Sequence, residues 1–534
     1  MSCHSILYIV VFLALWINCS TAQSPCDIMT FKYGNVCQCT EKYCDTITPL
    51  GIIPKLQAAL YESTSEHAET HRLTKLTNLQ FQKQINPNIT SLVQIDYTTK
   101  YQTILGFGGA FTDSASIVAH QLSENLQSKL LAQYFGEDGL NYNIGRIPMG
   151  GCDFSTYFYT YAPIWNDFEL NNFSIAMDLS TKIPFIKSAI SMSNETIYFF
   201  GSPWYGPDWL KNSSNPIGTL NGVAGDKYHE TWARYFSKFI EAYNSEGIPI
   251  WGITTQNEYG QVKDFAGLFY TTEQLADFLR IDLGPELRKN HPTVKIMTYD
   301  DDMVLLFSKI DKMIKRNNSI IQYIDGIAVH WYATEDMTFP DFYELFITKF
   351  EYPQFFYFPS EACEGYMKIN QGPRLGMWKR GIHYALSIIG DLLVGASGWT
   401  DWNIVLDLEG GPNHVQNFVD SPIIANTTSG TVFYKNPMYY AMGHFSKFIP
   451  RDSVRIGMKI LKTETASTLF ETLKIISFLT PNNQMVIVAL NHDLIFTQRI
   501  QILDPNQGYL TLTLLPESVQ TIIYDVESRS HLFS

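Results

Sequence analysis

Eight short, mostly apolar runs rich in β-branched and aromatic residues recur between about residue 100 and residue 400, each followed by polar or helical sequence. Apolar runs of this length are typical of parallel strands that are buried on both faces. Eight such strands alternating with helices predict an α/β fold, a (β/α)8 TIM barrel. The predicted strands are residues 102–107, 142–147, 196–201, 248–254, 294–299, 324–330, 354–359 and 395–400.

Helical periodicity is clearest in two of the intervening segments. The first covers residues 123–135, with Ser123 as the expected N-cap and Gly136 as the stop. The second precedes the fourth strand and ends at Gly247. The apolar faces predicted to pack on the barrel are Leu126, Leu130, Leu131 and Tyr134 in the first segment and Trp232, Phe236, Phe239, Ile240 and Tyr243 in the second.

After about residue 450 the pattern changes to strands separated by turn residues, at 484–490, 510–514 and 519–524. This pattern predicts an antiparallel all-β sandwich as an accessory domain. Because chain ends commonly meet, we expect the N-terminal strands to join it. The expected organisation is a signal peptide (1–22), a disulfide-tied segment with β-domain strands (23–98), the barrel (99–450) and the C-terminal sandwich (451–534).

Composition narrows the possible functions. The formal net charge of -14 and the pI near 5.3 argue against a nucleic-acid partner, because phosphate binding needs clustered Lys and Arg. The aromatic content of 14% suits an enzyme whose rings stack on sugars, although an aromatic core gives the same total.

The N-terminal sequence predicts secretion. Residues 1–22 combine an apolar run with the small residues Ser20, Thr21 and Ala22, as in a signal peptide, and no later stretch approaches the length of a membrane span. Cys26, Cys37, Cys39 and Cys44 favour the local disulfides Cys26–Cys37 and Cys39–Cys44, with zinc binding as the alternative. We expect a protein that enters the secretory pathway. Its candidate glycosylation sites are Asn88, Asn172, Asn194, Asn212, Asn317 and Asn426.

Two predicted strands end at an acid, Glu258 after the fourth and Glu361 after the seventh. Barrel strands direct their carboxyl ends at the active site, and a pair of carboxyl groups there is what glycoside hydrolysis needs. A single such glutamate is more often an ion-pair partner. The pair, on two strands of one predicted barrel, favours catalysis.

The residues around both acids resemble the acid β-glucosidase (glucosylceramidase, glucocerebrosidase) family, through Asn257-Glu258 and Ser360-Glu361-Ala362-Cys363. The resemblance implies a retaining mechanism with Glu258 as acid/base and Glu361 as nucleophile. Further stretches that carry it are 106–110 (GFGGA), 152–155 (CDFS), 232–236 (WARYF), 330–332 (HWY), 398–403 (GWTDWN), 409–413 (EGGPN), 417–423 (NFVDSPI) and 443–450 (GHFSKFIP).

The same resemblance implies a lysosomal or secreted enzyme that hydrolyses glucosylceramide to glucose and ceramide with no cofactor or metal. The partners that it implies are a saposin-type activator and an anionic membrane surface. Arg146 is a candidate cation for keeping Glu361 ionised, and a structural salt bridge is its alternative role. The rival functions are a same-family β-glycosidase of endo-glucanase or xylanase-like specificity and a catalytically silent sugar-binding relative. The implied glucose pocket is Asp153, Trp204, Asn257, Trp402 and Asn417, with His330 and Tyr332 beside the glutamates.

The chain departs from the family pattern in two places. Tyr259 stands where the family usually has proline, in a loop (260–270) that is shorter than usual. Residues 157–165 are unusually apolar, and we expect their rings to line the aglycone entrance or to touch lipid. Two other features carry no expected chemistry: Asp300-Asp301-Asp302 is assigned to loop charge, and Cys152 and Cys363 to free, partly buried thiols.

Overall fold

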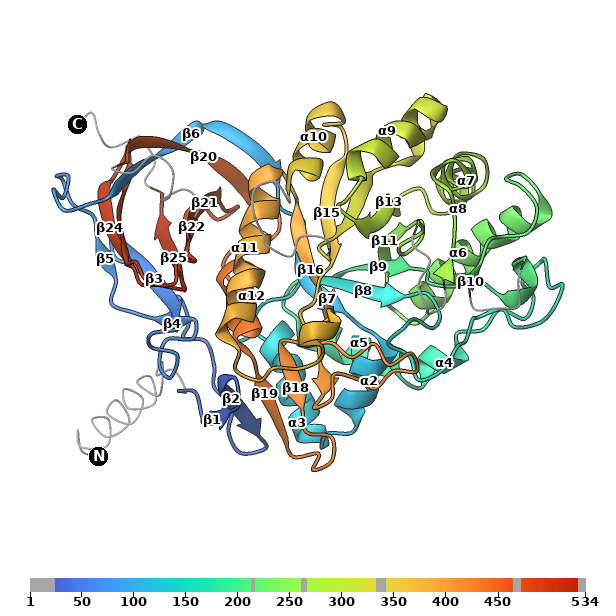
Figure 1. Ribbon diagram of the computed structural model, residues 1–534, viewed down its shortest axis with the longest axis horizontal. Helices are drawn as coiled ribbons and strands as arrows, with labels where there is room; N and C mark the ends of the chain where they lie inside the picture. The colour runs from blue at the N-terminus through green and yellow to red at the C-terminus, as the bar shows by residue number, and fades with distance from the viewer. Residues whose placement is uncertain (1–24, 213–216, 261–266, 333–341, 464–471, 527–534) are drawn as a thin grey trace, which may run out of the picture.

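The computed structural model describes residues 25–212, 217–260, 267–332, 342–463 and 472–526. Its centre is an eight-stranded sheet of parallel neighbours in the order β15-β14-β13-β11-β9-β8-β7-β16. The two ends of this order meet at a parallel bridge between Tyr357 and Ala396, where the Ser397 N–H donates to the Tyr357 carbonyl at 2.8 Å. The sheet closes into a barrel, so the predicted TIM-barrel fold is confirmed (Figure 1).

Each of the eight predicted strands overlaps one strand of this barrel. The prediction of the first strand, residues 102–107, was partly wrong. Residues 102 and 103 belong to β6, a strand of a separate ten-stranded sheet, and the barrel strand begins only at Gly106. The barrel strands are β7 (Gly106–Ala110), β8 (Ile144–Pro148), β9 (Tyr198–Ser202), β11 (Ile250–Thr254), β13 (Lys295–Asp302), β14 (Gly326–His330), β15 (Phe356–Glu361) and β16 (Gly398–Asn403).

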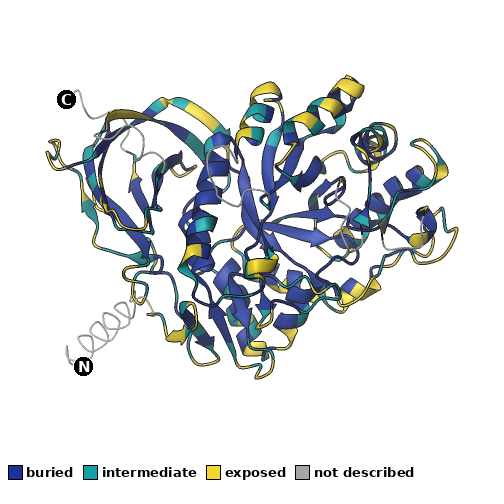
Figure 2. Ribbon diagram, in the orientation of Figure 1, coloured by how far each residue is buried: buried dark blue, intermediate teal, exposed yellow. Residues whose placement is uncertain are grey.

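Side chains from five of these strands fill the barrel interior. Ile144, Phe200, Met297, Ala328 and Phe358 form one buried cluster. Figure 2 shows the strands buried and the surrounding helices exposed only along their outer faces. The helices are α2 (Asp113–His120), α3 (Glu124–Phe135), α4 (Ala176–Leu179), α5 (Lys182–Met192), α6 (Lys227–Ser245), α7 (Thr272–Phe278), α8 (Gly284–Asn290), α9 (Leu306–Arg316), α10 (Tyr343–Glu351), α11 (Trp378–Val394) and α12 (Pro437–Ser446).

The second domain is a ten-stranded, mainly antiparallel sheet beside the barrel (Figure 1). It joins strands from both ends of the chain, as expected: β6 pairs with β20 and β23, and β3 pairs with β25. Its strands are β3 (Gln57–Thr64), β4 (Thr74–Lys75), β5 (Leu79–Gln80), β6 (Ser91–Thr103), β20 (Val454–Thr463), β21 (Leu473–Leu479), β22 (Gln484–Asn491), β23 (Gln498–Asp504), β24 (Gly508–Leu514) and β25 (Ser518–Asp525).

The first two strands lie elsewhere. β1 (Ile28–Phe31) and β2 (Gly34–Thr40) form a five-stranded sheet with β19 (Val432–Lys435), β18 (Ile423–Ala425) and β17 (Leu406–Asp407), which follow the last barrel strand. The disulfides Cys26–Cys37 and Cys39–Cys44 tie this segment together in the pairing expected from the sequence. The disulfide-tied segment therefore packs against the barrel side of the molecule.

Two further expectations concern the chain ends and the membrane. The predicted signal peptide, residues 1–22, lies outside the described residues. Within the described ranges, no helix combines the length and apolar character that a membrane crossing requires.

Candidate active site

Glu258 and Glu361 lie close together at the carboxyl end of the barrel. Glu361 is the last residue of β15 and Glu258 follows β11. Their side chains are 7% and 8% exposed, and one carboxylate oxygen of each lies within 4.8 Å of the other and of a ring nitrogen of His330. Retaining glycosidases hold their carboxyl groups about 5–5.5 Å apart, whereas inverting enzymes leave about 6.5–9.5 Å for a water. The spacing fits the retaining geometry.

Backbone contacts fix the position of Glu258. Its φ of +46° lies in the left-handed region, which costs energy for a residue with a side chain. Its N–H donates to the carbonyl of Asp300 at 2.8 Å, and the Asn257 N–H donates to that of Pro203 at 3.0 Å. The ring of Tyr259, 1% exposed, packs edge-on against Tyr299 at 6.0 Å. Packing of this ring thus anchors the turn where the family usually has proline.

Arg146 lies at the bottom of the site, fully buried on β8. Its guanidinium donates to Glu361, to Asp300 Oδ2 at 2.9 Å and to Asn257 Oδ1 at 2.8 Å. The guanidinium carbon also lies 4.8 Å from the ring centroid of Trp204 and 5.3 Å from that of Trp402. Arg146 therefore contacts Glu361 and also forms a buried ion pair with Asp300.

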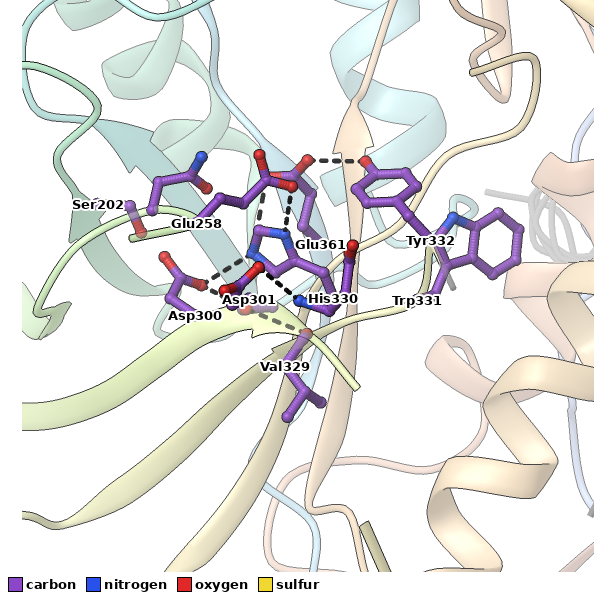
Figure 3. Close-up of polar contacts among 12 residues, drawn as sticks. Ser202, Glu258, Asp300, Asp301, Val329, His330, Trp331, Tyr332 and Glu361 are labelled. Atoms are coloured by element: carbon purple, nitrogen blue, oxygen red, sulfur yellow. Dashed lines mark hydrogen bonds and ion pairs between the residues drawn. The ribbon is translucent and has the colours of Figure 1, made fainter. Parts of the chain in front are cut away.

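His330, the last residue of β14, lies between the acids (Figure 3). Its Nδ1 is 3.3 Å from Glu258 Oε1 and its Nε2 is 3.1 Å from Asp300 Oδ1. Burial disfavours the charged ring, but Glu361, Asp300 and Glu258 together outweigh burial and raise the pKa of His330 to about 10. His330 is therefore a second buried cation at neutral and acidic pH.

Asp300 is a residue of the site that the sequence analysis did not identify. The expectation that Asp300-Asp301-Asp302 is loop charge was wrong. Asp300 and Asp301 are 0% and 1% exposed and belong to β13. Besides Arg146 and His330, the hydroxyls of Thr254 and Ser360 each donate to Asp300 at 2.6 Å. Burial opposes the charge of Asp300, but Arg146 and His330 hold its pKa well below the usual range. The sequence signal was a row of three acids at the end of the fifth predicted strand, which does not show which of the three faces the site.

Six of the seven residues expected to bind the sugar line a cavity of about 160 Å³. Tyr332 donates to Glu361 Oε1 at 2.7 Å, and Asn417 Nδ2 donates to Asp153 Oδ2 at 2.9 Å. Trp204 and Trp402 stack with ring centroids 5.3 Å apart. The lining residues are Asp153, Trp204, Asn257, Glu258, Tyr332, Glu361, Cys363, Tyr366, Trp402, Asn417 and Val419.

The structure thus brings all ten expected site residues into one cluster: eight line the cavity, and His330 and Arg146 lie behind it in contact with the carboxylates. It adds Tyr366, whose hydroxyl donates to the Tyr332 carbonyl at 2.9 Å. Tyr366 lies in a loop after β15 with no regular pattern, so nothing in the sequence marked it.

Glu258, His330 and Glu361 are also close enough together to be considered as metal ligands. A metal needs a neutral imidazole with a lone pair, whereas His330 is held protonated and uses both ring nitrogens toward acids. Cys39 and Cys44, which form a second such group with Asp45, are joined in a disulfide. The donor chemistry of these described residues therefore favours acid–base catalysis over metal binding.

Cys363 lines the pocket, and Cys152 is buried nearby in the same cluster of apolar residues. Both are free thiols. Burial raises the pKa of each thiol well above its ordinary value, so neither is a ready nucleophile.

A closed (β/α)8 barrel with two carboxylates facing each other at the carboxyl ends of β11 and β15 defines a glycoside hydrolase. A family model described as "Glycosyl hydrolase family 30 TIM-barrel domain" matches residues 104–449, and "Glycosyl hydrolase family 30 beta sandwich domain" matches residues 452–522. The chain belongs to glycosyl hydrolase family 30, and it is an enzyme that hydrolyses O-glycosyl bonds.

Individual relatives agree with this assignment. The chain is 39% identical over 530 residues to the lysosomal acid glucosylceramidase of Mus musculus, covering 96% of this chain and 98% of the relative. It is 25% identical over 404 residues to the endo-1,6-beta-D-glucanase BGN16.3 of Trichoderma harzianum, covering 72% and 78%. The crystal structure of SrfJ from Salmonella typhimurium superposes with a TM-score of 0.78 at 25% identity, covering 88% of this chain and all of SrfJ.

Proposed function

We propose that this enzyme is a retaining β-glucosidase that hydrolyses glucosylceramide to glucose and ceramide. The observation that carries the retaining mechanism is the pair of carboxylates within 4.8 Å at a cavity of about 160 Å³. The 39% identity to the mouse glucosylceramidase over nearly the whole of both chains supports the substrate.

In the first step, Glu258 donates its proton to the glycosidic oxygen while Glu361 attacks the anomeric carbon, and ceramide leaves. The product of this step is a glucosyl ester of Glu361. In the second step, Glu258 takes a proton from water, the water attacks the anomeric carbon, and the ester bond to Glu361 breaks. Two inversions at one carbon release glucose with its original β configuration.

The surrounding residues position Glu361 and hold the sugar. Arg146 and Tyr332 each donate a hydrogen bond to the Glu361 carboxylate. Because Asn257 Oδ1 already accepts from Arg146, its amide nitrogen is the group oriented to donate to the sugar 2-hydroxyl. Asp153, held by Asn417, accepts from hydroxyls at the far end of the ring.

A second candidate is endo-1,6-glucanase activity, which the 25% identity to the Trichoderma harzianum enzyme favours. The small cavity, which suits one sugar rather than a chain, and the higher identity to glucosylceramidase argue for the first candidate.

We also propose that the enzyme is lysosomal or secreted. Its proposed partners are a saposin-type activator and an anionic membrane surface. The two disulfides agree with the secretory pathway. Five asparagines of the predicted glycosylation sites are exposed and one, Asn426, is half-buried, so the first five are accessible to glycosylation: Asn88, Asn172, Asn194, Asn212 and Asn317.

The test compares wild type with Glu361→Gln on glucosylceramide dispersed in detergent at mildly acidic pH. We expect glucose release by wild type and a loss of about 10⁴-fold or more in the variant, because the covalent catalyst is gone. A cyclitol epoxide that reacts with the nucleophile should label Glu361 in wild type and leave the variant unlabelled. Glucose release from β-1,6-glucan but not from the lipid would transfer the assignment to the second candidate.

A further inference from the structure

Tyr332 and Tyr366 form a pair of tyrosines in the wall of the cavity that holds the two glutamates. Both side chains line the cavity and are half-buried. Their rings meet edge to face with centroids 4.9 Å apart, and the Tyr366 hydroxyl donates to the Tyr332 carbonyl at 2.9 Å. The Tyr332 hydroxyl in turn donates to Glu361 Oε1 at 2.7 Å (Figure 3). A continuous chain of contacts thus runs from Tyr366 through Tyr332 to Glu361.

The two carboxylate oxygens of Glu361 accept from different donors, Oε2 from Arg146 and Oε1 from Tyr332. A glutamate has little preference of its own for the rotation of its carboxylate, so these two hydrogen bonds set its orientation. Arg146 is fully buried and also donates to Asp300 and Asn257, whereas Tyr332 is only half-buried. The alignment of Glu361 therefore depends on what holds Tyr332 in place.

Tyr332 lies beyond the end of its barrel strand, because β14 ends at His330. The residue between them, Trp331, is still tied to the sheet, since its N–H donates to the Glu361 carbonyl at 3.3 Å. At Tyr332 the carbonyl accepts from the Tyr366 hydroxyl, and the ring packs on the Tyr366 ring. Tyr366 thus contacts both the backbone and the side chain of Tyr332.

The segment that carries Tyr366 is itself anchored from behind. Glu364, two residues earlier, is buried, and its carbonyl accepts from the Asp420 N–H at 2.8 Å. Its carboxylate oxygen Oε1 lies 2.7 Å from Nδ1 of His383, a residue of α11. A segment that is tied to a helix and to a second loop can impose a position on Tyr332 instead of adapting to it.

We propose that Tyr366 is a positioning residue for the nucleophile: it holds the Tyr332 hydroxyl on Glu361 and so keeps the carboxylate aligned with the anomeric carbon. This inference rests on the proposed function. Burial raises the pKa of Tyr332 well above its ordinary value, so the hydroxyl keeps the proton that it donates. Alignment matters because a misplacement of about 1 Å between reacting groups can cost about 100-fold in rate.

The experiment uses the full-length enzyme and the variants Tyr366→Phe, Tyr332→Phe and the double variant. Tyr366→Phe keeps the ring contact and removes only the hydroxyl. Its matched control is Tyr134→Phe, which loses a bond of the same type, from the buried Tyr134 hydroxyl to the Ile404 carbonyl at 2.6 Å. Tyr134 does not line the cavity.

Four measurements separate alignment from binding and from stability. The value of kcat/KM on a soluble aryl β-glucoside and the rate at which a cyclitol epoxide labels Glu361 both report the attack of the nucleophile. The inhibition constant of glucose reports sugar binding, and the thermal midpoint reports stability.

We expect Tyr366→Phe to lower kcat/KM and the labelling rate by about three- to tenfold, as the loss of one hydrogen bond implies. The inhibition constant of glucose should stay within about twofold of wild type, because the lost contact serves the nucleophile and not the sugar. In the Tyr332→Phe background, adding Tyr366→Phe should cause no further loss, because the contact through which Tyr366 acts is already gone. Tyr134→Phe should match wild type in kcat/KM and labelling rate.

A wild-type labelling rate in Tyr366→Phe, or losses that multiply in the double variant, would overturn the proposal. An inhibition constant of glucose that rises in step with the loss of rate would also overturn it, because Tyr366 would then bind the sugar itself. An equal loss of rate in Tyr134→Phe would do the same, since any lost tyrosine hydrogen bond would then suffice. If wild type left glucosylceramide intact, the proposed lipid substrate would be rejected, whereas the soluble glucoside would still test Tyr366.

Discussion

Asp300 joins the two buried cations of the active site. Arg146 and His330 both contact Asp300, and each also lies against Glu361 or Glu258. Asp300 thus links the two cations that hold the proposed catalytic pair in place. We therefore assign Asp300 as a positioning residue, which acts through Arg146 and His330 and does not line the cavity.

Replacing this acid should slow the reaction. In Asp300→Asn, one ionic acceptor is removed from two buried cations, and each hydrogen bond to a charged group is worth about 1.5–3 kcal/mol. We expect kcat/KM on a soluble aryl β-glucoside to fall about 100-fold or more. The rate at which the cyclitol epoxide labels Glu361 should fall in the same proportion, since labelling needs the aligned nucleophile.

The neighbouring acid provides the control. Asp301 is also buried, but it pairs with Lys309 at 3.0 Å, outside the group of charges around Glu258 and Glu361. Asp301→Asn should retain labelling and activity within a few-fold. Equal losses in the two variants would show that a negative charge anywhere on this strand suffices, which contradicts the positioning role.

At this scale the sequence could predict the two glutamates but not Asp300. Glu258 and Glu361 end apolar runs, so their place at strand ends is visible. Asp300 stands in a row of three aspartates. Left-handed φ values of +82° at Tyr299 and +51° at Asp300, with a shift of register there, decide which acid faces the site. Regular strand alternation cannot foresee such a bulge.

At the scale of elements, the sequence pattern predicted that each barrel strand exists, but it placed the first and last residues of the strands less accurately. All eight barrel strands overlap the predicted runs. The error at the first run has a local cause, because Ile104 and Leu105 connect β6 to β7 without a turn residue to mark the break. Apolar residues in a connection look the same as apolar residues in a strand.

The N-terminal caps of α3 and α6 differ in a way that residue types alone do not predict. Ser123 precedes α3 as predicted, but its hydroxyl makes no capping hydrogen bond. Asp226, before α6, accepts from the N–H groups of Tyr228 at 2.9 Å and His229 at 3.2 Å. Both residues are favoured N-caps, and only the geometry shows which side chain acts as one.

Because only Asp226 makes capping hydrogen bonds, truncating Asp226 to alanine should destabilise the protein more than truncating Ser123. Asp226→Ala should destabilise the protein by about 1–2 kcal/mol, because two amides of the first turn of α6 lose their acceptor. Hydrogen exchange of the Tyr228 and His229 amides should become faster, and the thermal midpoint should fall. Ser123→Ala should change neither the midpoint nor exchange in the first turn of α3. A larger loss in Ser123→Ala would contradict the assignment of the caps.

At the scale of the whole molecule, segments from both chain ends meet the barrel at His444. This residue of α12 places Nδ1 2.8 Å from Thr521 Oγ1 on β25 and Nε2 2.9 Å from Ser63 Oγ on β3. The sequence indicated that the chain ends share a domain, which the sheet order confirms. It could not indicate that β2, with β1 on its other side, pairs with β19 instead, because strand pairing depends on distant segments rather than on local pattern.

The burial of His444 links this junction to pH. Burial lowers its pKa from 6.5 to about 3, so between these two values the unfolded chain binds a proton that the folded chain does not. Stability therefore falls as pH decreases through this window, by about 1.4 kcal/mol per pH unit once the unfolded side chain is protonated. His330 acts in another window. Its pKa is raised to about 10, so its contribution is complete below about 6.5 and is lost as pH rises toward 10.

His444→Gln should flatten the acid side of the stability profile. Glutamine keeps polar groups near Ser63 and Thr521 but binds no proton, so the variant should be less stable than wild type at pH 7 and should lose less stability between pH 6.5 and 4.5. At pH 5 the removed penalty is about 2 kcal/mol. Thermal midpoints measured across this range check the slope, and the exposed His120, as His120→Gln, provides the control with a wild-type slope. Parallel profiles for wild type and His444→Gln would mean that this junction takes up a proton without unfolding, which its full burial between α12, β3 and β25 argues against.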